Sequence, residues 1–129
     1  MFSLNQEKVD TQENLTEQQH ALETSIAKMM VSDYEEVKEI EFTGWGYSPE
    51  TNSWGTTAII NKENRVSFLF DSLSGLETLS GYNYHPDTFK LEESPGFEEL
   101  LGPKFRLDSI EKTSLDGVKI IHSKNQKED

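Results

Sequence analysis

The stretch NLTEQQHALETSIAKMMVSDYEEVKEIEF, residues 14–42, determines the fold, because its hydrophobic period changes once along its length. Asn14 can cap the first free backbone N–H groups of a helix, and Glu17 completes a capping box. One apolar stripe at helical spacing follows, made of Leu15, Leu22, Ile26, Met29 and Met30. We therefore predict an amphipathic helix over residues 14–31, whose wet face carries Gln18, Gln19, Glu23 and Lys28.

The period changes to two after a turn at residues 33–36. Apolar and acidic residues alternate in VKEIEF, residues 37–42, which predicts a strand with one wet face. A glycine-rich loop leads to a second predicted strand, Trp54–Ile60, and a polar turn to a third over residues 65–71. Such an antiparallel meander needs a cover for its apolar face, which carries Ile40, Phe42, Val66, Phe68 and Phe70. Because the predicted helix is the available cover, we expect an α+β fold.

The rest of the chain has weaker patterns. Residues 72–93 predict a long, partly packed connection with a short strand at Thr88–Leu91. A short helix is expected between Ser94 and Pro103. Around Asp116-Gly117, a pair suited to the positive φ angles of a tight turn, we predict a C-terminal hairpin of residues 105–115 and 118–122.

The composition favours one domain with polar ends. A chain of 129 residues has the usual size of a single domain, and its hydrophobic share of 33% is low. Residues 1–13 are mostly polar, and residues 123–129 contain no apolar side chain. We therefore expect a flexible N-terminal arm over residues 1–13, a single α+β domain over residues 14–122 and a disordered tail over residues 123–129.

The net charge of −12 argues against nucleic acid as a partner, and an acidic surface would suit a basic protein partner. Acidic residues are concentrated in residues 33–41 and 87–99, although such a surface can also serve solubility alone. No apolar run is long enough to cross a membrane. A polar arm after a starting Met is also what remains when a signal peptide and its lipid-carrying Cys are removed. We thus expect an extracytoplasmic protein attached through an N-terminal anchor missing from this chain, or a cytoplasmic one if Met1 is the natural start.

No pattern in the sequence predicts catalysis. The chain has no cysteine, which excludes disulfides and thiolate chemistry. The histidines His20, His85 and His122 lie too far apart in sequence to form a local metal motif. His85 and Asp87 can form an acid/base pair or a hydrogen bond that orders a loop, and we favour the second role. We expect no enzymatic activity, no cofactor and no metal.

Three large aromatic residues bracket the loop between the first two predicted strands. Trp45, Tyr47 and Trp54 are either exposed binding anchors or a cross-strand pair closing a hairpin. Glu39 and Glu41 lie on the strand that enters this loop. We predict these five residues as the partner-binding set, with acidic and aromatic groups at one end of the domain.

The order of elements over residues 14–71 resembles small uncharacterised lipoproteins of Gram-positive bacteria and extracytoplasmic immunity proteins directed against secreted toxins. The resemblance rests on the capped helix, the acidic turn, the strand Val37–Phe42 and the hairpin around Asn61–Asn64. It implies a non-enzymatic domain held outside the membrane that binds another protein.

Three hypotheses about function remain. The first is a protein-binding or immunity-like module, and the second is a carrier that holds a small ligand between helix and sheet. The third is a hydrolase too degenerate to recognise.

Overall fold

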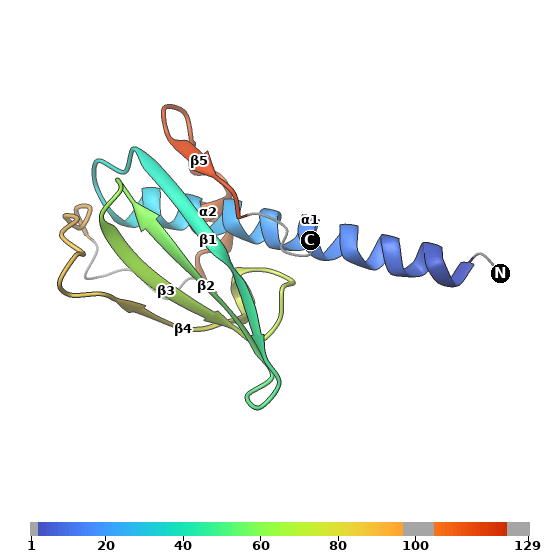
Figure 1. Cartoon of the computed structure of the whole chain (residues 1–129). Helices are drawn as coiled ribbons and strands as arrows, with labels where there is room; N and C mark the ends of the chain where they lie inside the picture. Colours follow the sequence, from blue (N-terminus) through green and yellow to red (C-terminus); the bar gives the residue numbers. More distant parts are fainter. Residues whose placement is uncertain (1–2, 97–104, 124–129) are drawn as a thin grey trace.

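A computed structural model describes residues 3–96 and 105–123, with side chains described from residue 15 onward. The elements in chain order are α1 (Ser3–Asp33), β1 (Glu39–Ser48), β2 (Ser53–Ile60), β3 (Asn64–Phe70), the 3-10 turn η1 (Leu76–Thr78), β4 (Leu79–Tyr84), α2 (Leu107–Glu111) and β5 (Lys119–Ile121). Figure 1 shows α1 lying across one face of the sheet, with its N-terminal part extending beyond the sheet. The architecture is therefore α+β, as predicted.

The sheet has five strands in the order β4-β3-β2-β1-β5. The first four strands pair antiparallel with their sequence neighbours, whereas β5 pairs parallel to β1. None of the helices in the described part of the chain is both long and apolar enough to cross a membrane.

A β-bulge in β1 decides which side chains face the helix. Phe42 pairs with Ala58 and Trp45 with Thr56, so three residue steps on β1 match two on β2. Gly44 has a φ of 134°, a value that favours glycine, and its carbonyl accepts a hydrogen bond from Thr56 Oγ1 at 2.7 Å. Without the extra residue, Trp45 would lie on the other face of the sheet from Phe42. The bulge places both on the face that α1 covers.

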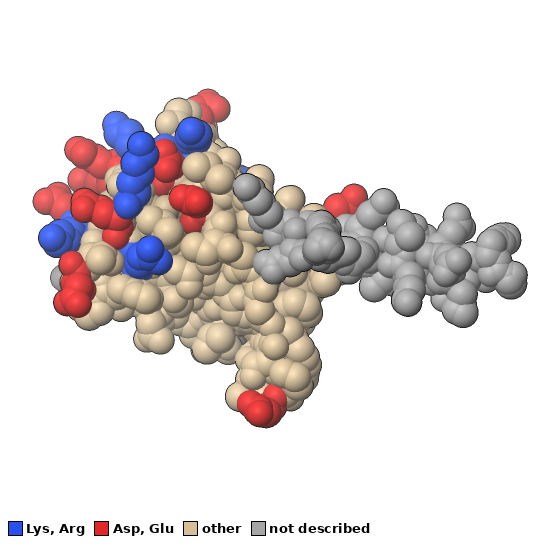
Figure 2. All heavy atoms as spheres, viewed as in Figure 1, with Lys and Arg blue, Asp and Glu red and all other residues tan. Residues whose placement is uncertain are grey.

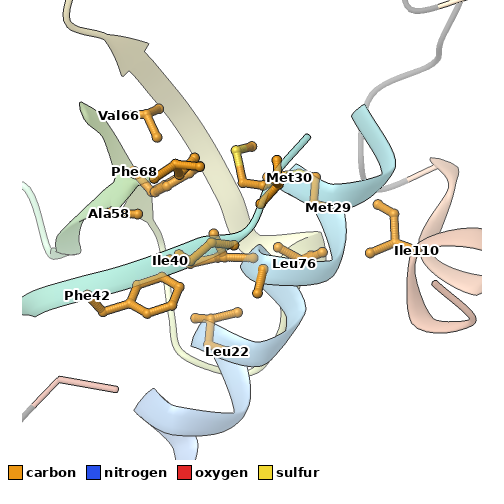
Figure 3. Close-up of a cluster of buried hydrophobic side chains, with 14 of the residues drawn as sticks. Leu22, Met29, Met30, Ile40, Phe42, Ala58, Val66, Phe68, Leu76 and Ile110 are labelled. Atoms are coloured by element: carbon orange, nitrogen blue, oxygen red, sulfur yellow. The ribbon is translucent and has the colours of Figure 1, made fainter. Parts of the chain in front are cut away.

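The core lies between α1 and this face, as the sequence predicts. Figure 3 shows Leu22 and Met30 of the helix among buried side chains of the strands. The predicted contact set is buried in one cluster: Leu22, Ile26, Met30, Ile40, Phe42, Val66, Phe68 and Phe70. Ile110 of α2 joins this cluster, so the short second helix lies on the same side of the sheet as the first.

Four predictions for the first part of the chain differ from the structure. β1 continues to Ser48, through much of the segment predicted as a glycine-rich loop. The helix begins at Ser3 rather than at Asn14, so the backbone of residues 3–13, predicted as an arm, is helical. The segment 79–84 is the fourth strand, although its glycine and polar residues suggested a connection. Thr88–Leu91 is not a strand. The segment 79–84 is a strand because it pairs with the edge of β3. Such a pairing leaves no clear hydrophobic period in the sequence of the segment itself.

The predicted C-terminal hairpin is wrong. Residues 107–111 form α2, and the last strand pairs with β1 instead of folding back on its own neighbour. The turn at Asp116-Gly117 does form, with a φ of 81° at Gly117, but it leads from α2 into β5. The helix predicted over residues 94–103 falls mostly outside the described residues. Of the predicted tail, Ser123 is buried, and residues 124–129 lie outside the described part.

The C-terminal end of α1 is fixed by a buried ion pair. Arg106 donates from Nη1 and Nη2 to the two carboxylate oxygens of Asp33, at 3.0 and 3.3 Å. Burial raises the pKa of Asp33, and the guanidinium of Arg106 opposes that rise. Asp33 therefore belongs to the interior and not to the exposed acidic stretch in which the sequence placed it.

Truncation of Phe68 to Ala should destabilise the protein by about 3–5 kcal/mol, because Phe68 is almost fully buried at the centre of the sheet. Leu69→Ala is the matched control, since Leu69 is 48% exposed on the opposite face. Urea unfolding followed by circular dichroism measures both. A loss below about 1 kcal/mol for Phe68→Ala would show that this face is not the core.

Candidate functional site

One face of the sheet is covered by none of the helices in residues 3–96 and 105–123. α1 and α2 lie behind the sheet in Figure 1, and the opposite face is formed by small and polar side chains of the central strands. At the centre of β2 and β3 these are Gly55, Thr57 and Ser67, and the apolar Leu69 lies beside them. Their neighbours in sequence point into the core. We refer to this surface as the open face.

A row of side-chain hydrogen bonds crosses the open face. Thr43 Oγ1 donates to the carbonyl oxygen of Thr57 at 3.2 Å, and the Thr57 and Ser67 hydroxyl oxygens are 3.0 Å apart. Ser67 Oγ lies 3.2 Å from His85 Nε2, just beyond the end of β4. The row spans the sheet from β1 to the far edge. Its hydroxyl groups give the open face donors and acceptors at fixed positions.

A shallow hollow of about 360 Å³ lies in the middle of the open face. Its lining includes Thr43, Gly55, Thr57, Ser67, Leu69 and Asn83. A Cβ atom at Gly55 would lie 3.4 Å from Leu69 Cδ2. Any larger residue at position 55 would therefore fill part of the hollow. Figure 2 shows most of the charged side chains of this view at its upper left and one acidic group at the lower tip, with an uncharged area between them. The hollow therefore offers an uncharged contact area beside an exposed leucine.

The structure does not bring the predicted partner-binding set together. Tyr47 and Trp54 pair across β1 and β2 with ring centroids 4.9 Å apart, on the same face as Phe42. Glu39 and Glu41 lie on the open face near the start of β1. Glu41 and Tyr47 are thus on opposite faces and about 20 Å apart along the strand.

Trp45 is a structural contact rather than an exposed anchor. Its ring lies 5.8 Å from that of Phe70, and its Nε1 donates to Glu23 Oε2 at 2.7 Å. Tyr47, which is 46% exposed, is the most accessible of the three aromatic residues. Tyr47 and Trp54 therefore form a cross-strand pair, which is one of the two roles considered from the sequence.

A buried carboxylate is the feature that the sequence analysis missed. Glu23, predicted on the wet face of the helix, has no exposed surface. Glu23 Oε1 accepts hydrogen bonds from His122 Nδ1 at 2.7 Å and from the Ser123 amide at 3.2 Å. Glu23 Oε2 accepts from the Ser123 hydroxyl and from Trp45 Nε1. The sequence offered one signal for this burial. Ala27 is a small apolar residue four positions after Glu23, so the two share a row of the helix beside Leu22 and Ile26, and the structure buries Ala27 as well.

The fold also brings two of the three histidines together. His20 and His122 stack with ring centroids 4.7 Å apart and an interplanar angle of 28°. His85 lies beyond β4 and contacts Ser67, and no hydrogen bond to Asp87 is formed among the described residues. The described residues therefore show neither the His85–Asp87 acid/base pair nor the hydrogen bond between these two residues that we favoured from the sequence.

Fold and surfaces together define a small α+β domain with one covered and one open sheet face. The chain matches no protein-family model, no curated protein and no solved structure. The arguments about function therefore rest on the geometry of its surfaces and clusters.

Replacing Trp45 with Phe should cost about 1.5–3 kcal/mol of stability, because it removes a donor from a buried carboxylate while keeping an aromatic ring. Trp54→Phe is the control, since the indole nitrogen of Trp54 makes no hydrogen bond within the described residues. Chemical unfolding of both variants provides the comparison. Equal effects of the two substitutions would contradict a structural role for the Trp45 to Glu23 bond.

Proposed function

We propose that this chain is a non-enzymatic protein-binding domain that docks its partner on the open face of the sheet. The observation that supports the proposal is the combination of an exposed Leu69 with an uncharged hollow over Gly55. Uncharged surfaces with an apolar centre and a polar surround are typical of protein interfaces.

The shape of the hollow favours a protein over a small molecule. Small-ligand sites are deep and mostly apolar, whereas this hollow is a shallow part of an open sheet surface lined by Thr57, Ser67 and Asn83. The space between helix and sheet, the alternative ligand site, is occupied by buried side chains such as Ile26, Met30 and Phe68. The geometry therefore favours the protein-binding hypothesis.

Charge directs the choice of partner in this proposal. A domain with a net charge of −12 attracts a basic protein over a distance, and the uncharged hollow then supplies the close contact. Glu39 and Glu41 lie on the open face at the start of β1 and would meet the basic groups of the partner. In keeping with the resemblance to extracytoplasmic immunity proteins, we place this binding outside the cell membrane.

A photo-crosslinking amino acid at position 69 tests this proposal in the source organism. We expect it to capture one defined protein, because Leu69 lies beside the hollow. The matched control carries the crosslinker at Gln18, an exposed position of α1 on the other side of the sheet. Equal capture at both positions, or none at position 69, would contradict docking on the open face.

Binding of the captured and purified partner then tests the surface quantitatively. Leu69→Lys should weaken the affinity at least tenfold, about 1.4 kcal/mol, as the loss of a central contact does. Gln18→Lys adds the same charge elsewhere and should leave the affinity within about twofold, which corresponds to less than 0.5 kcal/mol. Association should slow with added salt if the partner is basic.

A further inference from the structure

The stacked histidines are held by hydrogen bonds that fix which nitrogen of each ring carries the proton. His122 Nδ1 lies 2.7 Å from Glu23 Oε1, and His20 Nε2 lies 2.9 Å from the carbonyl oxygen of Ser123. A carboxylate and a carbonyl oxygen can only accept, so both of these ring nitrogens are donors. The other nitrogens, His20 Nδ1 and His122 Nε2, make no hydrogen bond within the described part of the chain.

Metal-ligating histidines commonly have this hydrogen-bond pattern. A ligating imidazole uses one nitrogen for the metal and donates the N–H of the other to a carboxylate or a backbone carbonyl, which fixes the ring and increases its basicity. Glu23 serves His122 in this way, and the Ser123 carbonyl serves His20. Both histidines are partly exposed, so an ion can reach them.

The fold gathers possible ligand groups of three side chains in one place. One possible ligand atom from each of His20, Glu23 and His122 lies within 4.8 Å of the others, and the two imidazole rings are stacked with centroids 4.7 Å apart. Two nitrogens on a tetrahedral zinc ion are about 3.3 Å apart, since each Zn–N bond is about 2.0–2.1 Å. Binding one ion therefore requires the partly exposed rings of His20 and His122 to turn until His20 Nδ1 and His122 Nε2 reach this separation.

We propose that His20 and His122 form a binding site for a divalent transition metal such as Zn²⁺, with Glu23 as the residue that positions His122. His20 Nδ1 and His122 Nε2 are the protein ligands, and water completes the coordination. The ion joins α1 to the segment after β5, two parts of the chain that are about 100 residues apart in sequence. Imidazole ligands select zinc, copper or nickel over magnesium and calcium.

Zinc titration of the Trp54→Phe protein tests the site. This background leaves Trp45 as the single tryptophan, and its indole contacts Glu23, so its fluorescence reports on the cluster. Excess Mg²⁺ occupies the exposed carboxylates of this acidic chain. Calorimetry with Zn²⁺ gives the stoichiometry, and we expect one ion per chain.

Four variants separate the proposed site from other zinc binding. His20→Ala and His122→Ala should each remove the one-to-one binding and the Trp45 response, whereas His85→Ala should leave both unchanged. Glu23→Gln should lower the affinity about 10- to 100-fold, as the loss of an orienting partner does. Circular dichroism checks that each variant is folded. If a substitution at Glu23 or His122 prevents folding, the result for His20→Ala decides between the proposed site and other zinc binding. One-to-one binding that persists in folded His20→Ala, or its absence from the parent protein, overturns the proposal.

Discussion

The buried carboxylate of Glu23 is the constraint on which the arrangement of this domain depends. An unpaired charge in the interior is strongly unfavourable, so its partners must be in place whenever the chain is folded. Those partners come from β1, through Trp45, and from the segment after β5, through His122 and Ser123. One side chain thus fixes the position of both segments relative to α1. The parallel pairing of β5 with β1 brings the C-terminal segment within reach of the helix.

The bulge in β1 allows Trp45 to act as a hydrogen-bond partner of Glu23. It keeps Trp45 on the helix side of the sheet, where its indole reaches Glu23, while Thr43 remains on the open face. The two proposals therefore concern opposite sides of the sheet. Protein binding uses the open face around Leu69, and metal binding uses the helix side at His20 and His122. Substitutions at one surface can be made without removing a contact of the other.

Local patterns predicted much of the fold correctly. The helical stripe of Leu22, Ile26 and Met30 and the first three strands were visible because burial on one side leaves a period of 3.6 or 2 in the sequence. Glu23 was misplaced because a charged residue beside the stripe is normally solvated, and the donors that allow its burial come from about 20 and 100 residues away. The partner-binding set failed to assemble because the period alone does not reveal a bulge.

The sequence by itself determined the α+β class, the helix and its buried face, and the antiparallel order of the first three strands, since each depends on residues close together in the chain. Only the tertiary structure decided the pairing of β4 and β5, the burial of Glu23, the face on which Trp45 lies and the meeting of His20 with His122. The physical reason is that strand edges and buried charges are satisfied by whichever segment the complete fold brings to them, however distant in sequence.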